Sequence, residues 1–280
     1  MQVLYIINTL SGGSAALIAI DTITYMISGF LIAIASTMAG IGGGAFMVPL
    51  FYFLGLQINN AVGTSKFVIT FLSFVGAMNY LRLKKVPIKP GLLVLIGMIP
   101  SSYIGAYTSN VLDQGILRLV ISVFIIFYSL RLIYKYVSIK LVRGSKEDPK
   151  NTHVDLNNIR IPWIKAVPIG LMSGFVAGLT GTGGGVINMP LFLGVLGIPI
   201  HNAVALSTFV IFPSSIAATV RHILNGDVVY RIGIPFVLGA ILGANIGPRI
   251  AGRMSRDRLR LFVGIILFYA GVRMLISVLG

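Results

Sequence analysis

Apolar residues occur in long uniform runs along the chain, separated by short polar stretches that carry most of the charge. In the first half the runs predict segments at 22–40, 42–56, 60–82, 90–110 and 116–136, and in the second half at 162–180, 183–198, 202–222, 232–249 and 260–279. Their length predicts membrane-spanning α-helices. They also lack the period-two alternation that is typical of a membrane β-barrel. The predicted fold class is an all-α polytopic integral membrane protein, surrounded by the lipid bilayer.

Composition favours the same fold class and excludes several functions. Of the 280 residues, 56% are apolar and only 10% are charged, whereas soluble domains carry about 25% charged residues. The net charge of +15 is explained by basic loops that flank membrane helices, so no nucleic acid partner is expected. The chain has no cysteine and three scattered histidines, and neither a metal site nor a cofactor is predicted.

The chain contains two homologous halves. The stretch "KPGLLVLIGMIPSSYIGAY" from Lys89 aligns without a gap with "RIGIPFVLGAILGANIGPR" from Arg231, and "GIGGGAFMVPLF" from Gly40 corresponds to "GTGGGVINMPLF" from Gly181. Internal duplication is a recurring feature of secondary transporters. The chain divides into an N-terminal membrane or interfacial segment (1–21), a first transmembrane repeat (22–136), a polar linker (137–161) and a second transmembrane repeat (162–280).

The first repeat begins with an uncharged apolar run that is too long for one helix. From Ile23 to Leu56 a straight helix would measure about 50 Å at about 1.5 Å per residue, whereas the hydrocarbon core is about 30 Å thick. We expect a break at the glycines and the proline, giving either two separate spans or a hairpin that enters and leaves on one side. Either way, each half has a Gly-broken helix pair plus three spanning helices, and this odd number would invert the two repeats.

The distribution of positive charge favours inverted over parallel repeats. Basic residues concentrate between Arg82 and Lys89, in the region around the linker, and between Arg249 and Arg260. Inverted repeats would place all three clusters on one side, whereas parallel repeats would place the last cluster opposite the others. Because basic loops face the cytoplasm, we predict inverted repeats in the cell membrane, with the basic loops and the linker cytoplasmic.

The two glycine breaks are predicted to bind an anion. A break at the start of a helix frees backbone N–H groups that carry the positive end of the helix dipole, and in inverted repeats two such breaks face each other around the substrate. The substrate-binding glycines on this interpretation are Gly42, Gly43 and Gly44 in the first repeat and Gly183, Gly184 and Gly185 in the second. The alternative is that these glycines only allow close helix packing.

Polar side chains near the breaks complete the predicted substrate site. They lie just after the second break and in the segment that follows each break: Thr182 and Asn188, then Thr64, Ser65 and Lys66, and the counterparts Ser207 and Thr208. The first break has Ile41 and Met47 where the second has Thr182 and Asn188. We therefore expect the second break to carry more of the substrate specificity.

The charged residues of the predicted segments indicate an anionic substrate. Lys66 is a cation within an apolar segment, where it either serves a transport pathway or reaches a nearby membrane interface. All seven acidic residues lie outside the middle of the predicted segments. A cation site or a carboxylate proton relay would need one there. The sequence therefore predicts an interior without a buried carboxylate, and an anion whose outward movement the membrane voltage alone can drive.

The two glycine motifs and the stretches after them resemble one known family. The motifs are "AGIGGGAFMVPLF" and "GLTGTGGGVINMPLF", and they are followed by "NNAVGTSKF" and "HNAVALSTF". In these features the chain resembles the sulfite exporter TauE/SafE family of membrane transporters. The resemblance implies transport, usually export, of sulfur-containing anions such as sulfite, sulfoacetate and other organosulfonates. It also implies about eight spans, which agrees with ten segments if each hairpin counts as one span.

Together these features predict a secondary transporter, not an enzyme, that binds a small anion between the breaks and exposes it to each side in turn. An anion channel built from the same parts is the first alternative. An intramembrane enzyme would need a nucleophile or an acid–base pair, and the sequence shows no such pairing. A third alternative is a membrane subunit that serves an external partner, and only the basic linker supports it. The sequence leaves open whether copies of the chain form a homo-oligomer.

Overall fold

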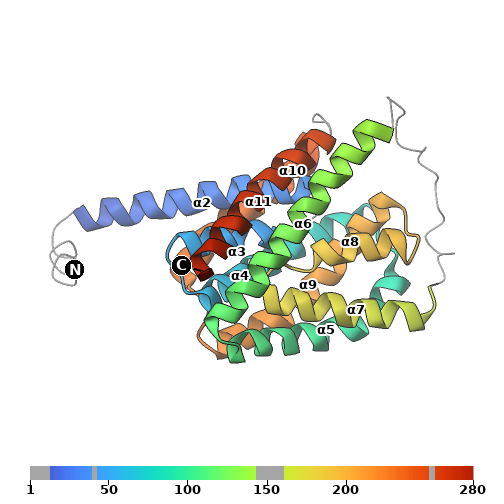
Figure 1. Cartoon of the computed structure of the whole chain (residues 1–280), viewed down its shortest axis with the longest axis horizontal. Coiled ribbons are helices and arrows are strands. Elements are labelled where there is room, and N and C mark those ends of the chain that lie inside the picture. Colours follow the sequence, from blue (N-terminus) through green and yellow to red (C-terminus); the bar gives the residue numbers. More distant parts are fainter. Residues whose placement is uncertain (1–12, 40–42, 143–160, 252–255, 280) are drawn as a thin grey trace.

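The computed structural model describes residues 13–39, 43–142, 161–251 and 256–279, and this part of the chain is all-helical (Figure 1). The first half contributes α2 (Gly13–Ala39), α3 (Gly44–Phe53), α4 (Ile58–Arg82), α5 (Ile88–Val111) and α6 (Gln114–Val142). The second half contributes α7 (Trp163–Thr180), α8 (Gly185–Gly194), α9 (Ile200–Leu224), α10 (Tyr230–Ala251) and α11 (Arg256–Leu279). Each helix corresponds to one predicted segment, and the predicted all-helical membrane fold class is confirmed.

Helices α3 and α8 are half-length helices. Each has 10 residues, which at about 1.5 Å per residue spans about 15 Å, half the thickness of the hydrocarbon core. Among the described helices, α4, α5, α7 and most of α6 and α9 are long and apolar enough to cross a membrane. The long apolar run therefore breaks into a long helix followed by a half-length one, and the alternative of two separate full spans is wrong.

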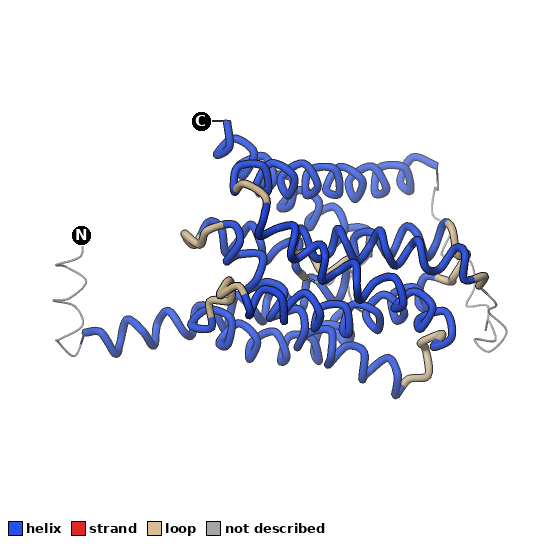
Figure 2. Tube along the Cα trace, turned by 90° about the horizontal axis from the view of Figure 1, so that it is seen from below, coloured by secondary structure: helices blue, strands red, loops and turns tan. Residues whose placement is uncertain are grey.

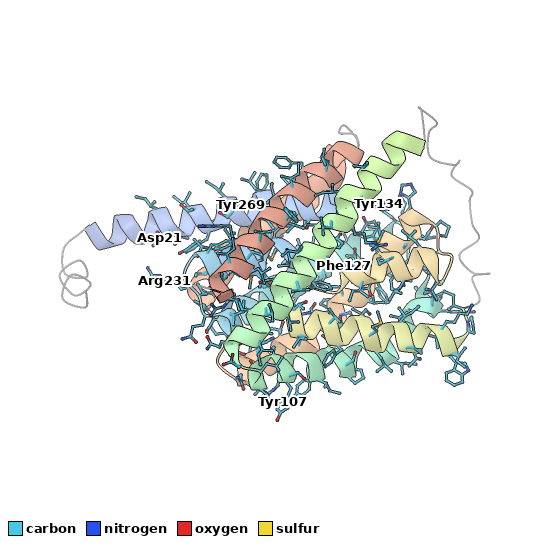
Figure 3. The ribbon with its side chains drawn as sticks, in the orientation of Figure 1. Asp21, Tyr107, Phe127, Tyr134, Arg231 and Tyr269 are labelled. Atoms are coloured by element: carbon cyan, nitrogen blue, oxygen red, sulfur yellow. The ribbon has the colours of Figure 1, made fainter. Side chains whose placement is uncertain are left out.

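Helix α2 begins earlier than the sequence indicates. It runs without interruption from Gly13, so the predicted boundary after Asp21 falls inside the helix. The charge of Asp21 does not end the helix, because its carboxylate stays exposed at the surface, 3.9 Å from Arg231 of α10 (Figure 3). The first turns of α2 extend beyond the rest of the bundle (Figures 1 and 2). Residues 1–12 lie outside the described part.

Glycines let α5 and α7 pack backbone to backbone. A methyl group on Gly170 would meet the carbonyl oxygen of Val94, and one on Gly178 would meet the carbonyl oxygen of Ser102. With Gly174 between them, the glycines of α7 recur every four residues on one face. In a membrane, where lipid is as apolar as the side chains, such small-residue contacts supply the van der Waals packing that joins helices.

The same backbone-to-backbone packing occurs between α10 of the second half and α2 of the first half. Methyl groups on Gly239 and Gly243 would meet the carbonyl oxygens of Met26 and Phe30 of α2. Gly239 is the counterpart of Gly97, which approaches the backbone of α7 in the same way. The duplicated glycines therefore make equivalent helix contacts in both halves.

Helices α4 and α9 are counterparts that pack against each other and run antiparallel. The hydroxyl oxygens of Thr70 and Thr219 lie 3.0 Å apart, whereas Gly76, further along α4, lies against the methyl group of Thr208, earlier in α9. Helices α6 and α11 form a second antiparallel pair of counterparts, side by side in Figure 1. Both pairs join the first half of the chain to the second.

The helix ends that flank the three basic clusters lie at one end of the bundle, which we call the basic end. Asn202, at the start of α9, donates a hydrogen bond to the carbonyl oxygen of Lys85, between α4 and α5 (2.9 Å). Helices α5 and α7 run parallel from this end, and α6 returns to it beside the start of α11. This is the clustering that inverted repeats require. Which end faces the cytoplasm stays a prediction, as does the role of the linker, whose residues 143–160 lie outside the described part.

The outer surface of the bundle is apolar. Phe127 and Tyr134 of α6 and Tyr269 of α11 project outward with 67%, 74% and 65% of their surface exposed (Figure 3). Large exposed apolar surfaces mark regions that contact another apolar phase. Together with helices that are long enough to cross a bilayer, this surface identifies a multi-pass membrane protein.

Replacement of Gly178 by alanine should destabilise the protein, because the added methyl group would meet the backbone of α5. Overpacking of this kind costs about 1–3 kcal/mol. Gly194 is the matched control, since no atom lies within 4 Å of a methyl group added there. In detergent, Gly178→Ala should lower the melting temperature, and Gly194→Ala should leave it unchanged or raise it through helix propensity. Equal melting temperatures for the two variants would show that α5 and α7 do not pack through their backbones.

Candidate functional site

Both half-length helices begin after a glycine with left-handed backbone conformation. Gly43 precedes α3 with a φ of 80°, and Gly184 precedes α8 with a φ of 82°. Glycine adopts a positive φ without steric cost, whereas residues with a Cβ atom are strained there by roughly 1–2 kcal/mol. The requirement for this turn explains why glycine recurs at both positions. Gly42, which the sequence also assigns to the site, lies outside the described residues.

The first turn of each half-length helix presents backbone N–H groups that have no partner within the helix. In α3 the first N–H group bonded within the turn is that of Phe46, to the carbonyl oxygen of Gly43 (3.1 Å). In α8 it is that of Ile187, to the carbonyl oxygen of Gly184 (3.0 Å). The preceding N–H groups point out of the helix start, where the helix dipole is positive.

The two glycine breaks meet inside the bundle. A methyl group on Gly44, the first residue of α3, would meet the carbonyl oxygen of Gly181 and would lie 2.7 Å from the carbonyl carbon of Thr182. The start of α3 therefore abuts the loop between α7 and α8, and we call this contact the break junction. Gly44 has a packing role in this contact, while substrate binding by the glycines stays a prediction.

Helix α4 holds the break junction in place. Ser65 donates its hydroxyl hydrogen to the carbonyl oxygen of Gly181 (2.9 Å). One turn earlier Val62 contacts Gly181, and one turn later Ile69 contacts Gly44. One face of α4 therefore touches both sides of the break junction.

Lys66 is buried beside the break junction. Its side chain has no exposed surface, and its Nζ atom has no hydrogen-bond partner. It follows Ser65 and shares a helical face with Val62 and Ile69, which lie one turn to either side of it. The alternative in which the amine of Lys66 reaches a membrane interface is therefore wrong.

Asn188 and Ser207 come together at the second break. Both side chains are buried, and Nδ2 of Asn188 lies 3.4 Å from Oγ of Ser207, while its Oδ1 atom has no partner. If the amide is turned over, Ser207 can donate to Oδ1 and the amide N–H groups become free to bind an anion. The second break also holds Thr182, whose hydroxyl lies 2.9 Å from that of Thr180, and is therefore the more polar of the two.

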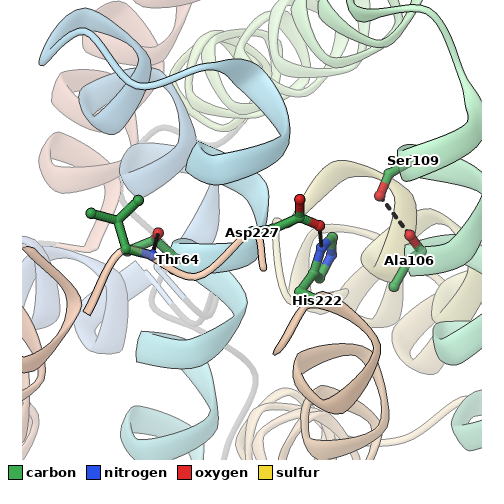
Figure 4. Close-up of polar contacts among 6 residues, drawn as sticks. Thr64, Ala106, Ser109, His222 and Asp227 are labelled. Atoms are coloured by element: carbon green, nitrogen blue, oxygen red, sulfur yellow. Dashed lines mark hydrogen bonds and ion pairs between the residues drawn. The ribbon is translucent and has the colours of Figure 1, made fainter. Parts of the chain in front are cut away.

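Thr64 and Thr208, the remaining predicted site residues, have partners away from the break junction. The hydroxyl oxygen of Thr64 accepts a hydrogen bond from the N–H group of Val229, just before α10 (3.0 Å; Figure 4). Thr208 donates to the carbonyl oxygen of Val204 in its own helix (2.9 Å). The hydroxyl of Thr64 therefore joins α4 to the segment before α10, and that of Thr208 bonds within α9. The other predicted polar residues lie at the breaks or beside them: Ser65, Lys66, Thr182, Asn188 and Ser207.

A buried histidine–carboxylate pair lies at the end of α9. Nδ1 of His222 is 2.9 Å from Oδ2 of Asp227, and both residues are buried (Figure 4). The sequence predicts an interior without a buried carboxylate, and this prediction is wrong. Asp227 follows the last turn of α9, so its position outside the predicted spans concealed its burial.

The turn at the end of α9 explains why the two side chains meet. The N–H group of Asp227 bonds to the carbonyl oxygen of His222 (2.9 Å), the N–H group of Gly226 bonds to that of Ile223 (3.0 Å), and Gly226 has a φ of 77°. These are the hydrogen bonds of a Schellman turn, in which the residues at the two ends of the motif touch. The stretch "HILNGD" therefore carried a readable signal for this pair.

Known proteins similar to this chain are membrane transporters. A family model described as sulfite exporter TauE/SafE matches residues 25–274. A probable membrane transporter protein of Bacillus subtilis (strain 168), YunE, is 28% identical over 261 residues, which cover 89% of this chain and 96% of the relative. A probable membrane transporter protein of Methanocaldococcus jannaschii is 27% identical over 268 residues, which cover 90% of this chain and 94% of the relative.

No solved structure matches the chain. The family match includes both glycine breaks, the buried Lys66 and the pair at the end of α9. Because the match spans both halves and the whole candidate site, the chain belongs to the sulfite exporter TauE/SafE family of membrane transporters.

Proposed function

We propose that this protein is a secondary transporter that exports small sulfur-containing anions, with sulfite and organosulfonates such as sulfoacetate as substrates. The family description supports sulfite as a substrate and export as the direction. The observation that carries the proposal is the buried amine of Lys66, which has no partner and lies beside the break junction.

A buried ammonium group requires a counter-charge. Removing a charged group from water costs several kcal/mol unless an opposite charge or good hydrogen bonds compensate, and ionisable residues inside a membrane usually mark a transport pathway. Nζ of Lys66 has no hydrogen-bond partner and, among the described residues, no carboxylate within ion-pair distance. A bound anion would supply it, and because Lys66 shares its helical face with the residues that touch Gly181 and Gly44, the anion would lie at the break junction.

The two breaks would supply directional hydrogen-bond donors to that anion. The free N–H groups at the starts of α3 and α8 combine hydrogen bonding with the positive end of a helix dipole. A sulfite ion and a sulfonate group each carry three oxygen atoms that accept hydrogen bonds from different directions. Lys66 and the two helix starts provide three donor groups of this kind, while Thr182 and Asn188 add donors on the side of the second break.

Alternating access would come from movement of one repeat against the other. We infer that the repeats are inverted, and the antiparallel packing of α4 against α9 and the shared basic end support this. The two halves meet through the glycine contacts of α5 with α7 and of α2 with α10, and through α4 and α9, where the hydroxyl oxygens of Thr70 and Thr219 lie 3.0 Å apart. Rocking about this contact would open the break junction to each side in turn, as in other transporters with inverted repeats.

Counterflow in liposomes tests the proposed function. Liposomes that contain the purified protein and unlabelled sulfoacetate should transiently accumulate labelled sulfoacetate from outside, at zero voltage and equal pH. Uptake should saturate with concentration, as expected of a carrier and not of an open channel. Absence of counterflow with both sulfoacetate and sulfite would overturn the proposal.

Replacement of Lys66 by methionine should abolish anion binding without destabilising the empty protein. Methionine is uncharged and of similar length, and because Nζ of Lys66 contacts no hydrogen-bond partner, the substitution breaks no hydrogen bond or ion pair. We expect the affinity for sulfite to fall at least about tenfold, which corresponds to about 1.4 kcal/mol, while the melting temperature without sulfite stays equal or rises. Isothermal titration calorimetry and thermal unfolding measure both quantities.

Lys85→Met is the matched control for this experiment. Lys85 is exposed and lies at the basic end, away from the break junction, so its replacement should leave the affinity for sulfite unchanged. If Lys66→Met lowered the melting temperature and kept the affinity of the wild type, Lys66 would be a structural residue and not a ligand for the anion.

Replacement of Ser65 by alanine should weaken anion binding through the geometry of the break junction. Its hydroxyl fixes the carbonyl group of Gly181 (2.9 Å), and loss of such a hydrogen bond costs about 1 kcal/mol. Ser73→Ala is the matched control, because the hydroxyl of Ser73 bonds only to carbonyl oxygens of its own helix. We expect a several-fold loss of sulfite affinity for Ser65→Ala alone. Equal sulfite affinities for the two variants would show that Ser65 does not contribute to the anion site.

A further inference from the structure

The His222–Asp227 pair lies at the end of the bundle opposite the basic end. Gly63, near the start of α4, approaches it so closely that an added methyl group would lie 2.8 Å from Cβ of Asp227. The C-terminal end of α4, which is followed by Lys84 and Lys85, belongs to the basic end. The pair therefore lies where a path from the break junction toward the opposite surface would pass.

His222 offers one buried nitrogen that has no partner. Its Nδ1 atom is bonded to Asp227, whereas Nε2 is buried and unpaired. When the carboxyl group of Asp227 is ionised, Nδ1 carries the hydrogen of that bond and Nε2 keeps a free lone pair. Nε2 can therefore take up one proton without breaking the hydrogen bond to Asp227.

Other unpaired polar atoms lie at the same end of the bundle as the pair. They belong to Asn59 at the start of α4, Asn110 at the end of α5 and Arg221, which precedes His222. Buried polar groups in proteins are almost always bonded, to water if not to protein. We therefore expect water at this end of the bundle, and with it a route by which protons reach His222.

The stretch of α4 around Lys66 packs against the last turns of α9 and the residues that follow them. One turn before Lys66, Gly63 contacts Asp227. One turn after it, Thr70 pairs with Thr219, which lies on the turn of α9 just before the histidine. Lys66 therefore lies between the break junction on one side and the His222–Asp227 pair on the other.

The charged and titratable groups on the elements around His222 are few. They are Arg221 on α9, Tyr107 on α5, Lys66 on α4, Asp227 itself, and Tyr230 and Arg231 at the start of α10. Arg221 is partly exposed and lies 4.9 Å from the ring of Tyr107. Arg231 is exposed and lies 3.9 Å from Asp21, so water screens the charges of both arginines. Of the described residues, Lys66 and His222 are the fully buried basic groups that can balance the charge of Asp227.

We propose that each monovalent anion crosses the membrane together with one proton, which Nε2 of His222 takes up and releases. The proposal rests on the proposed function. Without substrate, the charge of Lys66 offsets that of Asp227 across the protein interior, without contact between the two groups, while His222 is neutral. A bound anion adds one negative charge, and a proton on Nε2 restores neutrality. Because unbalanced charge in a low-dielectric interior is costly, proton binding and anion binding favour each other, as linkage requires.

The proton balance of a transport cycle follows directly. Water on one side of the membrane gives a proton to the lone pair of Nε2 as the anion binds, and the imidazolium returns it to water on the other side as the anion leaves. The empty and loaded forms carry the same charge. Net flux then follows the product of the anion and proton gradients, in place of the voltage-driven flux that the sequence predicts.

The first repeat has the same turn with different chemistry. At the end of α4 the N–H group of Lys85 bonds to the carbonyl oxygen of Tyr80 (3.1 Å), and Lys84 has a φ of 51°. Tyr80 and Lys85 stand where the second repeat has His222 and Asp227. The turn itself therefore does not require a histidine–carboxylate pair, and the pair is a property of one end of the pathway.

Liposomes that contain the purified full-length protein test the coupling with labelled isethionate, a monovalent organosulfonate without a titratable group near neutral pH. Counterflow at equal pH and zero voltage reports transport alone. Net uptake is then measured under an inward tenfold proton gradient at zero voltage, and under an inside-positive voltage at equal pH. We expect accumulation of up to about tenfold under the proton gradient, and none under voltage.

The outcomes in the wild-type protein separate the two proposals. If sulfite, sulfoacetate and isethionate all fail to show counterflow, the proposed function is overturned. Counterflow of isethionate together with net uptake that follows voltage and ignores the proton gradient would overturn the proton coupling and leave the proposed function standing.

Variants test whether His222 is the residue that carries the transported proton. His222→Gln should still exchange isethionate, more slowly, but its net uptake should respond to voltage and not to the proton gradient. Asp227→Asn should show the same change, because the empty site then carries the uncompensated charge of Lys66. His201→Gln, at the exposed opposite end of α9, is the matched control and should behave as the wild type. Proton-driven accumulation of wild-type size in His222→Gln would overturn the assignment.

Discussion

The contact between Gly44 and the carbonyl group of Gly181 is the interaction on which the rest of the site depends. It brings the start of α3 against the loop between α7 and α8, and it leaves no room for a side chain at residue 44. The hydroxyl of Ser65 fixes the same carbonyl group, so α4 is held with its next residue, Lys66, turned into the protein.

The scaffold is duplicated, but its electrostatics are not. Glycine packing recurs in both halves, and so does the positive φ before each half-length helix. The first repeat supplies the buried amine of Lys66, and the second supplies Asn188 at its break and the His222–Asp227 pair at one end. In the proposed mechanism, the symmetric packing provides two equivalent walls that move against each other. The asymmetric chemistry provides the proposed anion site that both walls share, with the proposed proton exchange at one end.

Much of the fold follows from the sequence, because bilayer thickness and helix geometry leave few choices for long apolar runs. The ten segments and the location of both breaks could be predicted in this way. Helix ends that depend on local charge could not, as at Asp21, where an exposed carboxylate beside Arg231 lets α2 continue. The burial of Asp227 also escaped prediction, and the sequence left open whether Lys66 is buried or reaches a membrane interface, since a residue near a predicted helix end can lie under neighbouring helices that only the tertiary fold brings there.

The most direct measurement is an experimental structure of the protein in lipid, crystallised with selenite. Selenite has the pyramidal shape of sulfite, and its selenium atom gives an anomalous X-ray signal that identifies it without ambiguity. We predict one anomalous peak inside the bundle, within hydrogen-bonding reach of Nζ of Lys66 and of the N–H groups at the starts of α3 and α8. Peaks confined to the basic surface loops, or no peak at selenite concentrations that shift the melting temperature, would contradict an anion site at the break junction.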